Sequence, residues 1–292
     1  MRVVICRFAL TIAGLLLGLQ ARGADADRPV RTLETPGGVR FGIWGDLPAA
    51  PSPTLFILAN TIDGTLGGPY FRQAGQALGK QGYLCVSVDL PCHGEEHRSD
   101  EPRDLAGWRH RCEQGENFVE EANRRLSQVL DHLVAAGHTQ ATKVAVCGTS
   151  RGGFMALHFA ASDARVKCVA AYAPVTDLAA LREFHGAEAN SLVKSLALIQ
   201  VAEKLAGRAV WIVIGDCDER VGTDHAIALA RGITKASLAK GLAGRVDLHV
   251  VAEPRGHTTP AGAAEQSAAW IHAQLDSSAA TPQPQQSRSA EE

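Results

Sequence analysis

The central part of the chain alternates short, continuously apolar runs with longer segments in which apolar residues recur every three or four positions. The first pattern is typical of strands buried on both faces, and the second of amphipathic helices. The strand-like runs span 31–37, 39–46, 53–60, 83–90, 142–148, 165–173, 208–215 and 246–254. The helix-like segments span 69–82, 116–137, 151–161, 224–241 and 261–275.

Apolar strands separated by helices predict a mostly parallel sheet covered on both faces, which is a three-layer α/β/α sandwich. We expect about eight strands, with the first two joined as an antiparallel hairpin at Gly37-Gly38. Residues 91–110 have the composition of a long loop, and residues 177–206 that of a mostly helical insertion. The insertion is expected to form a small cap over the site and to influence substrate choice.

The two ends of the chain differ in composition from the region between them. Residues 1–26 carry two arginines, then a short apolar run, then small residues, which is the order of a secretory signal peptide. That apolar run is short for a bilayer span, so no stable membrane span is expected after processing, although an N-terminal anchor helix is an alternative. Residues 277–292 are rich in Pro, Gln and Ser and are expected to be disordered, which leaves one domain at 27–276 in a secreted or periplasmic protein.

Charge and cysteine content narrow the class of protein further. The formal net charge is −2, so nothing favours nucleic acid as a partner. Six cysteines follow Cys6, and no pair of them has the close spacing of a zinc site. Cys92 and Cys112 fall in or near the long loop and could form a disulfide after export, which the sequence alone leaves open.

One candidate nucleophile is Ser150, in the sequence Gly-Thr-Ser-Arg-Gly between a predicted strand and a predicted helix. The G-x-S-x-G pattern alone is weak, but a strand, a sharp turn and a helix place such a serine at the top of a sheet. Gly148 and Gly152 are expected to leave room for the turn. The backbone N–H of Arg151 begins the helix and is expected to donate to an oxyanion.

A serine needs a base, and the base needs a carboxylate that orients it. Among the histidines beyond Asp218, only His257 is expected in a loop, after the last strand. The loop after strand 208–215 offers several acids; Asp218 is the expected partner of His257, Asp216 is the competing candidate, and Asp224 is expected to cap the next helix.

The order Ser150, Asp218, His257, with GTSRGG, the G-x-x-D-x-x-V of GDCDERV and the GH of PRGHTTP, resembles the α/β-hydrolase superfamily. Within it, the chain is similar to the prolyl oligopeptidase-type and dienelactone-hydrolase-type branch. Dienelactone hydrolases proper use cysteine, whereas this chain has Ser150. Many relatives carry His-Gly after the strand at 53–60; this chain has Asn60-Thr61, so the second oxyanion donor is expected to be the backbone N–H of Ile62, or that of Thr61.

A further part of the resemblance is Asp89 and His93 in DLPCHGEEH, which are expected to shape a loop rather than react. The Arg151 side chain is expected in a surface ion pair, with a substrate carboxylate as the alternative partner.

These features predict a serine hydrolase that cleaves a small ester, or a short acyl or peptidyl substrate, through an acyl-enzyme and without a cofactor. A peptidase or acyl-aminoacyl hydrolase with the same triad is one alternative, and a catalytically silent binding protein on the same fold is another.

Overall fold

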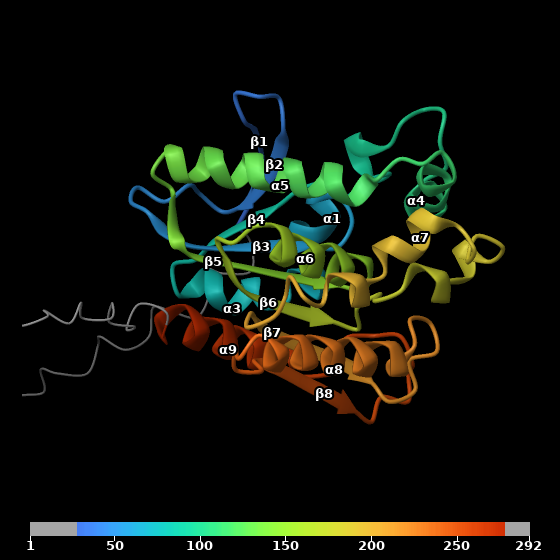
Figure 1. Ribbon diagram of the computed structural model, residues 1–292. Helices are drawn as coiled ribbons and strands as arrows, with labels where there is room; N and C mark the ends of the chain where they lie inside the picture. The colour runs from blue at the N-terminus through green and yellow to red at the C-terminus, as the bar shows by residue number, and fades with distance from the viewer. Residues whose placement is uncertain (1–27, 278–292) are drawn as a thin grey trace, which may run out of the picture.

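A computed structural model describes residues 28–277 (Figure 1). The predicted signal peptide lies outside the described residues. So does the predicted tail, except that the last helix includes its first residue, Ser277. Among the described residues no helix is long and apolar enough to cross a membrane.

The sheet has eight strands in the order β1-β2-β4-β3-β5-β6-β7-β8. β1 pairs antiparallel with β2 and β2 with β4, whereas the remaining pairs are parallel. The prediction of a mostly parallel eight-stranded sheet that begins with an antiparallel hairpin is therefore confirmed. The strands are β1 Val30–Glu34, β2 Arg40–Trp44, β3 Ser52–Leu58, β4 Leu84–Ser87, β5 Thr139–Thr149, β6 Val166–Tyr172, β7 Ala209–Gly215 and β8 Val246–Val251.

Helices cover both faces of the sheet, which gives the predicted three layers (Figure 1). Side chains alternate across each strand, so Val144 and Val146 of β5 join one apolar cluster while Ala145 and Cys147 join the other. The first cluster is closed by α5 Phe118–Ala135, α6 Arg151–Ser162 and α8 Thr223–Ala239. The second is closed by α1 Ile62–Gly67, α3 Gly75–Lys80 and α9 Ala263–Ser277.

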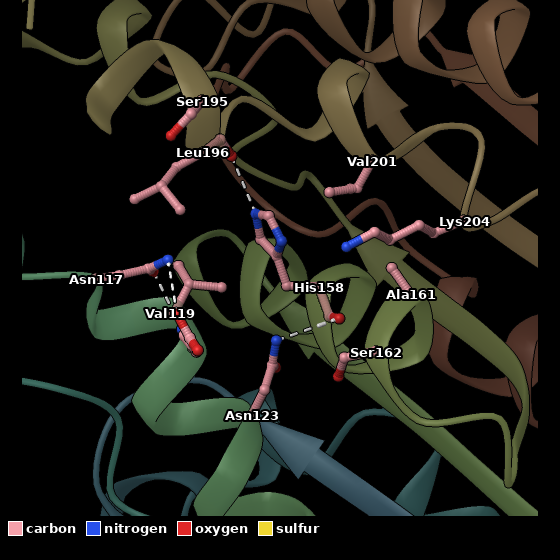
Figure 2. Close-up of a pocket in the computed structure, with 11 residues that line it drawn as sticks. Asn117, Val119, Asn123, His158, Ala161, Ser162, Ser195, Leu196, Val201 and Lys204 are labelled. Atoms are coloured by element: carbon pink, nitrogen blue, oxygen red, sulfur yellow. Dashed lines mark hydrogen bonds between the residues drawn. The ribbon is translucent and has the colours of Figure 1, made fainter. Parts of the chain in front are cut away.

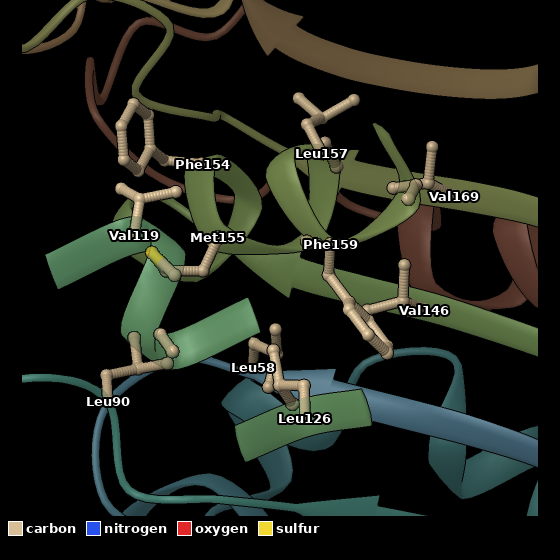
Figure 3. Close-up of a cluster of buried hydrophobic side chains, with 14 of the residues drawn as sticks. Leu58, Leu90, Val119, Leu126, Val146, Phe154, Met155, Leu157, Phe159 and Val169 are labelled. Atoms are coloured by element: carbon tan, nitrogen blue, oxygen red, sulfur yellow. The ribbon is translucent and has the colours of Figure 1, made fainter. Parts of the chain in front are cut away.

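Helix α6 is fixed by an apolar face that is completely buried. Phe154, Met155, Leu157 and Phe159 all have no exposed surface and pack among side chains of the sheet and of α5 (Figure 3). Burial of each such side chain stabilises the fold by roughly 1.5–3 kcal/mol. The helix that begins immediately after Ser150 is therefore a rigid support for that residue.

Two segments differ from the prediction. The helix expected over 69–82 is broken into α2 Pro69–Arg72 and α3 by Gln73, whose φ of 45° lies in the left-handed region. The loop expected over 91–110 contains a 3₁₀ turn, η1 Gly94–Glu96, and its end belongs to α4 Asp104–Glu113. The Gln73 side chain donates to Thr149 and Thr259, which are far away in the sequence, so no local periodic pattern marks the break.

The insertion at 177–206 is helical, as predicted, but consists of short pieces. They are η2 Leu178–Ala180, η3 Arg182–Phe184, α7 Ser191–Leu196 and η4 Leu198–Val201. Arg220 holds the insertion near the acid-bearing loop, because its guanidinium contacts both carboxylate oxygens of Glu183 at 2.7 and 2.8 Å.

The described cysteines are all free thiols, and five of the six are buried. The disulfide between Cys92 and Cys112 that the sequence left open is not formed in this structure. Both thiols lie in the first apolar cluster and pack as small hydrophobic groups.

Candidate active site

Ser150 lies on a sharp turn between β5 and α6, at the carboxyl edge of the sheet. Its backbone has φ 55° and ψ −116°, an uncommon conformation for a residue with a side chain. The turn is tight: a Cβ at Gly148 would lie 2.2 Å from the Gly152 carbonyl oxygen, and a Cβ at Gly152 would lie 1.8 Å from that of Leu58. The structure therefore agrees with the predicted role of both glycines.

His257 and Asp218 meet Ser150 from the loops that follow β8 and β7. His257 Nε2 lies 3.0 Å from Ser150 Oγ, and His257 Nδ1 lies 2.8 Å from Asp218 Oδ2. Because a carboxylate only accepts, the Nδ1 nitrogen carries the proton and Nε2 is free to accept the serine proton. The three residues singled out from the sequence are thus brought into one hydrogen-bonded line.

The Asp218 side chain is fully buried, and its other oxygen is also occupied. Oδ1 accepts the backbone N–H groups of Arg220 at 3.1 Å and Val221 at 3.3 Å. These bonds aim Oδ2 at His257. The competing candidate, Asp216, instead accepts the Glu253 N–H at 3.0 Å.

Asp224 does not cap α8, as was expected. The cap position is Gly222, with φ 79°, and Asp224 lies in the first helical turn. A carboxylate there still interacts favourably with the positive end of the helix dipole.

Arg151 contributes differently through its backbone and its side chain. As the first residue of α6, it has an N–H with no acceptor within the helix. Its guanidinium donates to His93 Nε2 at 2.7 Å and to Asp104 Oδ1 at 2.8 Å. The predicted ion pair is therefore present, and the N–H beside Ser150 remains a candidate oxyanion donor.

His93 holds the Arg151 side chain in a defined position. Burial lowers the pKa of His93. Nδ1 donates to the Pro91 carbonyl at 2.8 Å, and Nε2 lies 2.7 Å from the Arg151 guanidinium and 2.8 Å from Asp104 Oδ1. His93 shapes the loop, as the sequence suggested, and it contacts Arg151, the residue after Ser150.

The structure does not leave the Ile62 N–H open as an oxyanion donor. That group donates to Asp89 Oδ1 at 2.7 Å, and the other Asp89 oxygen accepts the Glu95 N–H at 3.0 Å. The Thr61 N–H is also occupied, since it donates to Asn60 Oδ1 at 2.7 Å. Both donors expected from the sequence are thus engaged within the protein, because a buried carboxylate and a side-chain amide compete for them.

Gln73 and Tyr70, which the sequence analysis did not single out, secure the loop that carries His257. Gln73 Nε2 lies 3.0 Å from Thr259 Oγ1 and 3.3 Å from Thr149 Oγ1, so it joins that loop to the strand before Ser150. The Tyr70 hydroxyl accepts the Thr259 N–H at 3.0 Å. No sequence motif marks these residues, because their partners lie far away in the chain.

A second feature is a cavity of about 460 Å³ between α5, α6 and the insertion (Figure 2). It lies on the flank of α6, and neither Ser150, Asp218 nor His257 lines it. His158 lines it and donates from Nε2 to the Leu196 carbonyl at 3.0 Å, while the Lys204 side chain lies beside the same ring. This hydrogen bond joins α6, the helix that follows Ser150, to the insertion.

Within residues 28–277 no group of three or more His, Cys, Asp or Glu side chains is arranged to hold a metal ion.

The parallel sheet, the serine on a strained strand-to-helix turn, and the His and Asp on the two later loops define an α/β-hydrolase. The family model for the prolyl oligopeptidase family matches residues 69–276. The chain belongs to that family and is a hydrolase. No curated protein matches the sequence.

Solved structures share the fold at low sequence identity. A Thermus thermophilus protein is 20% identical with a TM-score of 0.62, over 85% of this chain and 99% of its own. A cold-adapted esterase from an Arctic intertidal metagenomic library is 18% identical with a TM-score of 0.60, over 84% and 93%. Dipeptidyl peptidase 4 of Porphyromonas gingivalis is 16% identical with a TM-score of 0.59, over 84% of this chain but 35% of its own.

Proposed function

We propose that this protein is a serine hydrolase that cleaves a carboxylic ester through an acyl-enzyme. The observation that carries the proposal is the line Ser150–His257–Asp218, with contacts of 3.0 and 2.8 Å and the serine held at φ 55°. A serine hydroxyl is a weak nucleophile unless a base takes its proton as it attacks. In the proposed mechanism His257 is that base, and Asp218 is the carboxylate that fixes its tautomer.

In the proposed reaction Ser150 Oγ attacks the carbonyl carbon while His257 Nε2 accepts the hydroxyl proton. Asp218 stabilises the resulting imidazolium without taking its proton. The Arg151 N–H donates to the oxyanion, which forms as the carbonyl π electrons move to oxygen. Collapse of the intermediate expels the alcohol, which receives the proton from His257, and water then releases the acid by the same steps.

An ester is preferred as the substrate class over a peptide. The esterase among the similar structures is matched over nearly its whole length, whereas the dipeptidyl peptidase is matched over about a third. The peptidase alternative has its own support in the family to which the chain belongs. Both reactions use the same triad, so they differ only in the leaving group.

The proposal is tested with a fluorophosphonate probe and with two substrate series. The wild-type protein should be labelled at Ser150 and should hydrolyse p-nitrophenyl esters faster than aminoacyl p-nitroanilides. Ser150→Ala should abolish both signals, whereas Ser162→Ala, at the other end of α6, is the matched control and should retain them. Equal turnover of esters and anilides would overturn the ester preference, and an unlabelled Ser150 in the folded protein would overturn the enzyme assignment.

We also propose export, on the basis of the charged, apolar and small-residue order of residues 1–26. Expression of the full chain in a bacterium, followed by fractionation and N-terminal sequencing, tests it. A mature protein that begins near residue 24 or 27 supports export, and an intact cytoplasmic chain contradicts it.

A further inference from the structure

We propose that the side-chain amide of Asn60 is the second oxyanion donor of this enzyme, acting together with the Arg151 N–H. The inference rests on the proposed function, because it assigns a role in the same acyl transfer. Its ligand is the carbonyl oxygen of the substrate, at the moment when that oxygen becomes negatively charged.

The orientation of the Asn60 amide is fixed by chemistry. Oδ1 faces the Thr61 N–H at 2.7 Å, and a backbone N–H can only donate, so the facing atom must be oxygen. Thr65 Oγ1, 3.2 Å away, donates to the same oxygen and in turn accepts the Asn60 N–H at 3.2 Å. The Thr61 N–H and the Thr65 hydroxyl thus form a cradle for Oδ1, and Nδ2 cannot be the amide atom that faces it.

Gly64 is part of the same cradle. A Cβ at position 64 would lie 2.6 Å from Asn60 Oδ1, a separation that real Cβ atoms do not adopt. The Gly64 N–H also donates to Thr61 Oγ1 at 3.0 Å, which starts helix α1. The turn after β3 thus accommodates the Asn60 amide in one orientation.

Asn60, which carries the free donor, lies at the same end of the sheet as Ser150. β3 and β5 are parallel neighbours, with Leu58 opposite Gly148, so two more residues along each chain lead to Asn60 and Ser150. The first turn of α6 is stacked on the same segment, since a Cβ at Gly152 would lie 1.8 Å from the Leu58 oxygen and 2.8 Å from Ala59 Cα. Asn60 therefore follows directly on the segment against which the N-terminus of α6 packs.

Asn60 Nδ2 makes no hydrogen bond to any residue in the described part of the chain, and the side chain is only partly buried. The other donors of this turn are occupied, because Ile62 N–H binds Asp89 and Thr61 N–H binds Asn60 itself. A preorganised donor with no internal partner is what an oxyanion site requires. Asn60 Nδ2 and Arg151 N–H would then donate together to the oxygen made negative by the attack of Ser150.

The test is Asn60→Asp, which keeps the Oδ1 acceptor of the cradle but replaces the donor by a carboxylate oxygen. On p-nitrophenyl acetate we expect kcat to fall about 100- to 1000-fold, as for loss of one oxyanion donor, with KM changed by less than about threefold. Affinity for a trifluoromethyl ketone, which forms an oxyanion adduct, should fall in parallel with kcat. Asn117→Asp, an isosteric change at the exposed N-cap of α5, is the control and should leave all three values unchanged.

Asn60→Ala is the second variant and should show the same loss if Asn60→Asp does not fold. If either folded variant keeps kcat and ketone affinity within about threefold of wild type, the role of Asn60 is overturned while the triad stands. Such a change is far smaller than the fall in kcat that follows removal of an oxyanion donor. A fall in kcat with no fall in affinity for the ketone beyond the change in KM would also overturn it, since that pattern indicates a structural role. Failure of the proposed function itself is distinguishable, because Ser150 would then be unlabelled by fluorophosphonate in the wild-type protein.

Discussion

His158 predicts a specific dependence of stability on pH. The ring is buried in α6, with its Nε2 bonded to the Leu196 carbonyl (Figure 2). Its plane is edge-on to the Phe154 ring at a centroid distance of 4.5 Å. Burial, the main cause, lowers the pKa of His158 from 6.5 to about 4. Between these two pH values the unfolded chain binds a proton at this residue that the folded protein does not.

The sign of the effect follows from this difference in proton binding. Since the unfolded state binds more protons, the free energy of unfolding decreases as the pH falls from 6.5 towards 4. At 1.36 kcal/mol for each pH unit, the contribution lost is about 2 kcal/mol by pH 5 and about 3 kcal/mol by pH 4. A loss of this size is a large fraction of the stability of an ordinary domain.

Urea unfolding of the wild type and of His158→Gln at pH 7, 6, 5 and 4 measures the contribution. The Gln amide can replace the Nε2 donor to Leu196 but has no proton to gain in this range. The wild-type advantage should therefore shrink by about 3 kcal/mol between pH 7 and pH 4. His249→Gln, on the exposed face of β8, controls for the loss of a histidine as such. A difference between wild type and His158→Gln that does not change with pH would refute the reasoning.

Two substitutions test the other buried polar groups. In Asp218→Asn the amide oxygen should accept the two backbone N–H groups that Oδ1 now accepts, so that the NH₂ group faces His257 Nδ1. The histidine is then forced into the tautomer whose Nε2 cannot accept the Ser150 proton. The value of kcat should fall about 10⁴-fold with Tm retained, and a fall of less than tenfold would contradict this. Glu101→Gln removes the carboxylate that lies 2.6 Å from the Arg111 guanidinium. The Glu101 side chain is 2% exposed and that of Arg111 4%, so the substitution leaves a buried guanidinium without its counter-charge. Urea unfolding at pH 7 should show a loss of about 3–5 kcal/mol, and a loss under about 1 kcal/mol would show that the charge is solvated.

The sequence by itself predicted the layers of this protein and the three residues that the structure joins in one hydrogen-bonded line. The fold followed from periodicity, because apolar strands and amphipathic helices can bury their surfaces in few arrangements. Ser150 could be singled out because it immediately follows a strand, and His257 because it lies in the loop after the last strand. The carboxyl ends of parallel strands meet at one edge of the sheet. Asp218 could be preferred to Asp216 through the G-x-x-D-x-x-V resemblance.

Only the tertiary structure decided which backbone N–H groups remain available around Ser150. The Ile62 N–H is taken by Asp89, 27 residues away, and the Gln73 amide joins strands and loops up to 186 residues apart. Such hydrogen bonds leave no periodic trace in the sequence, because the partners are chosen by proximity in the folded chain. The Asn60-Thr61 turn was visible as a departure from the family pattern, but its free donor depends on the fold, because the Thr61 and Ile62 N–H groups have acceptors there and Asn60 Nδ2 has none among the described residues.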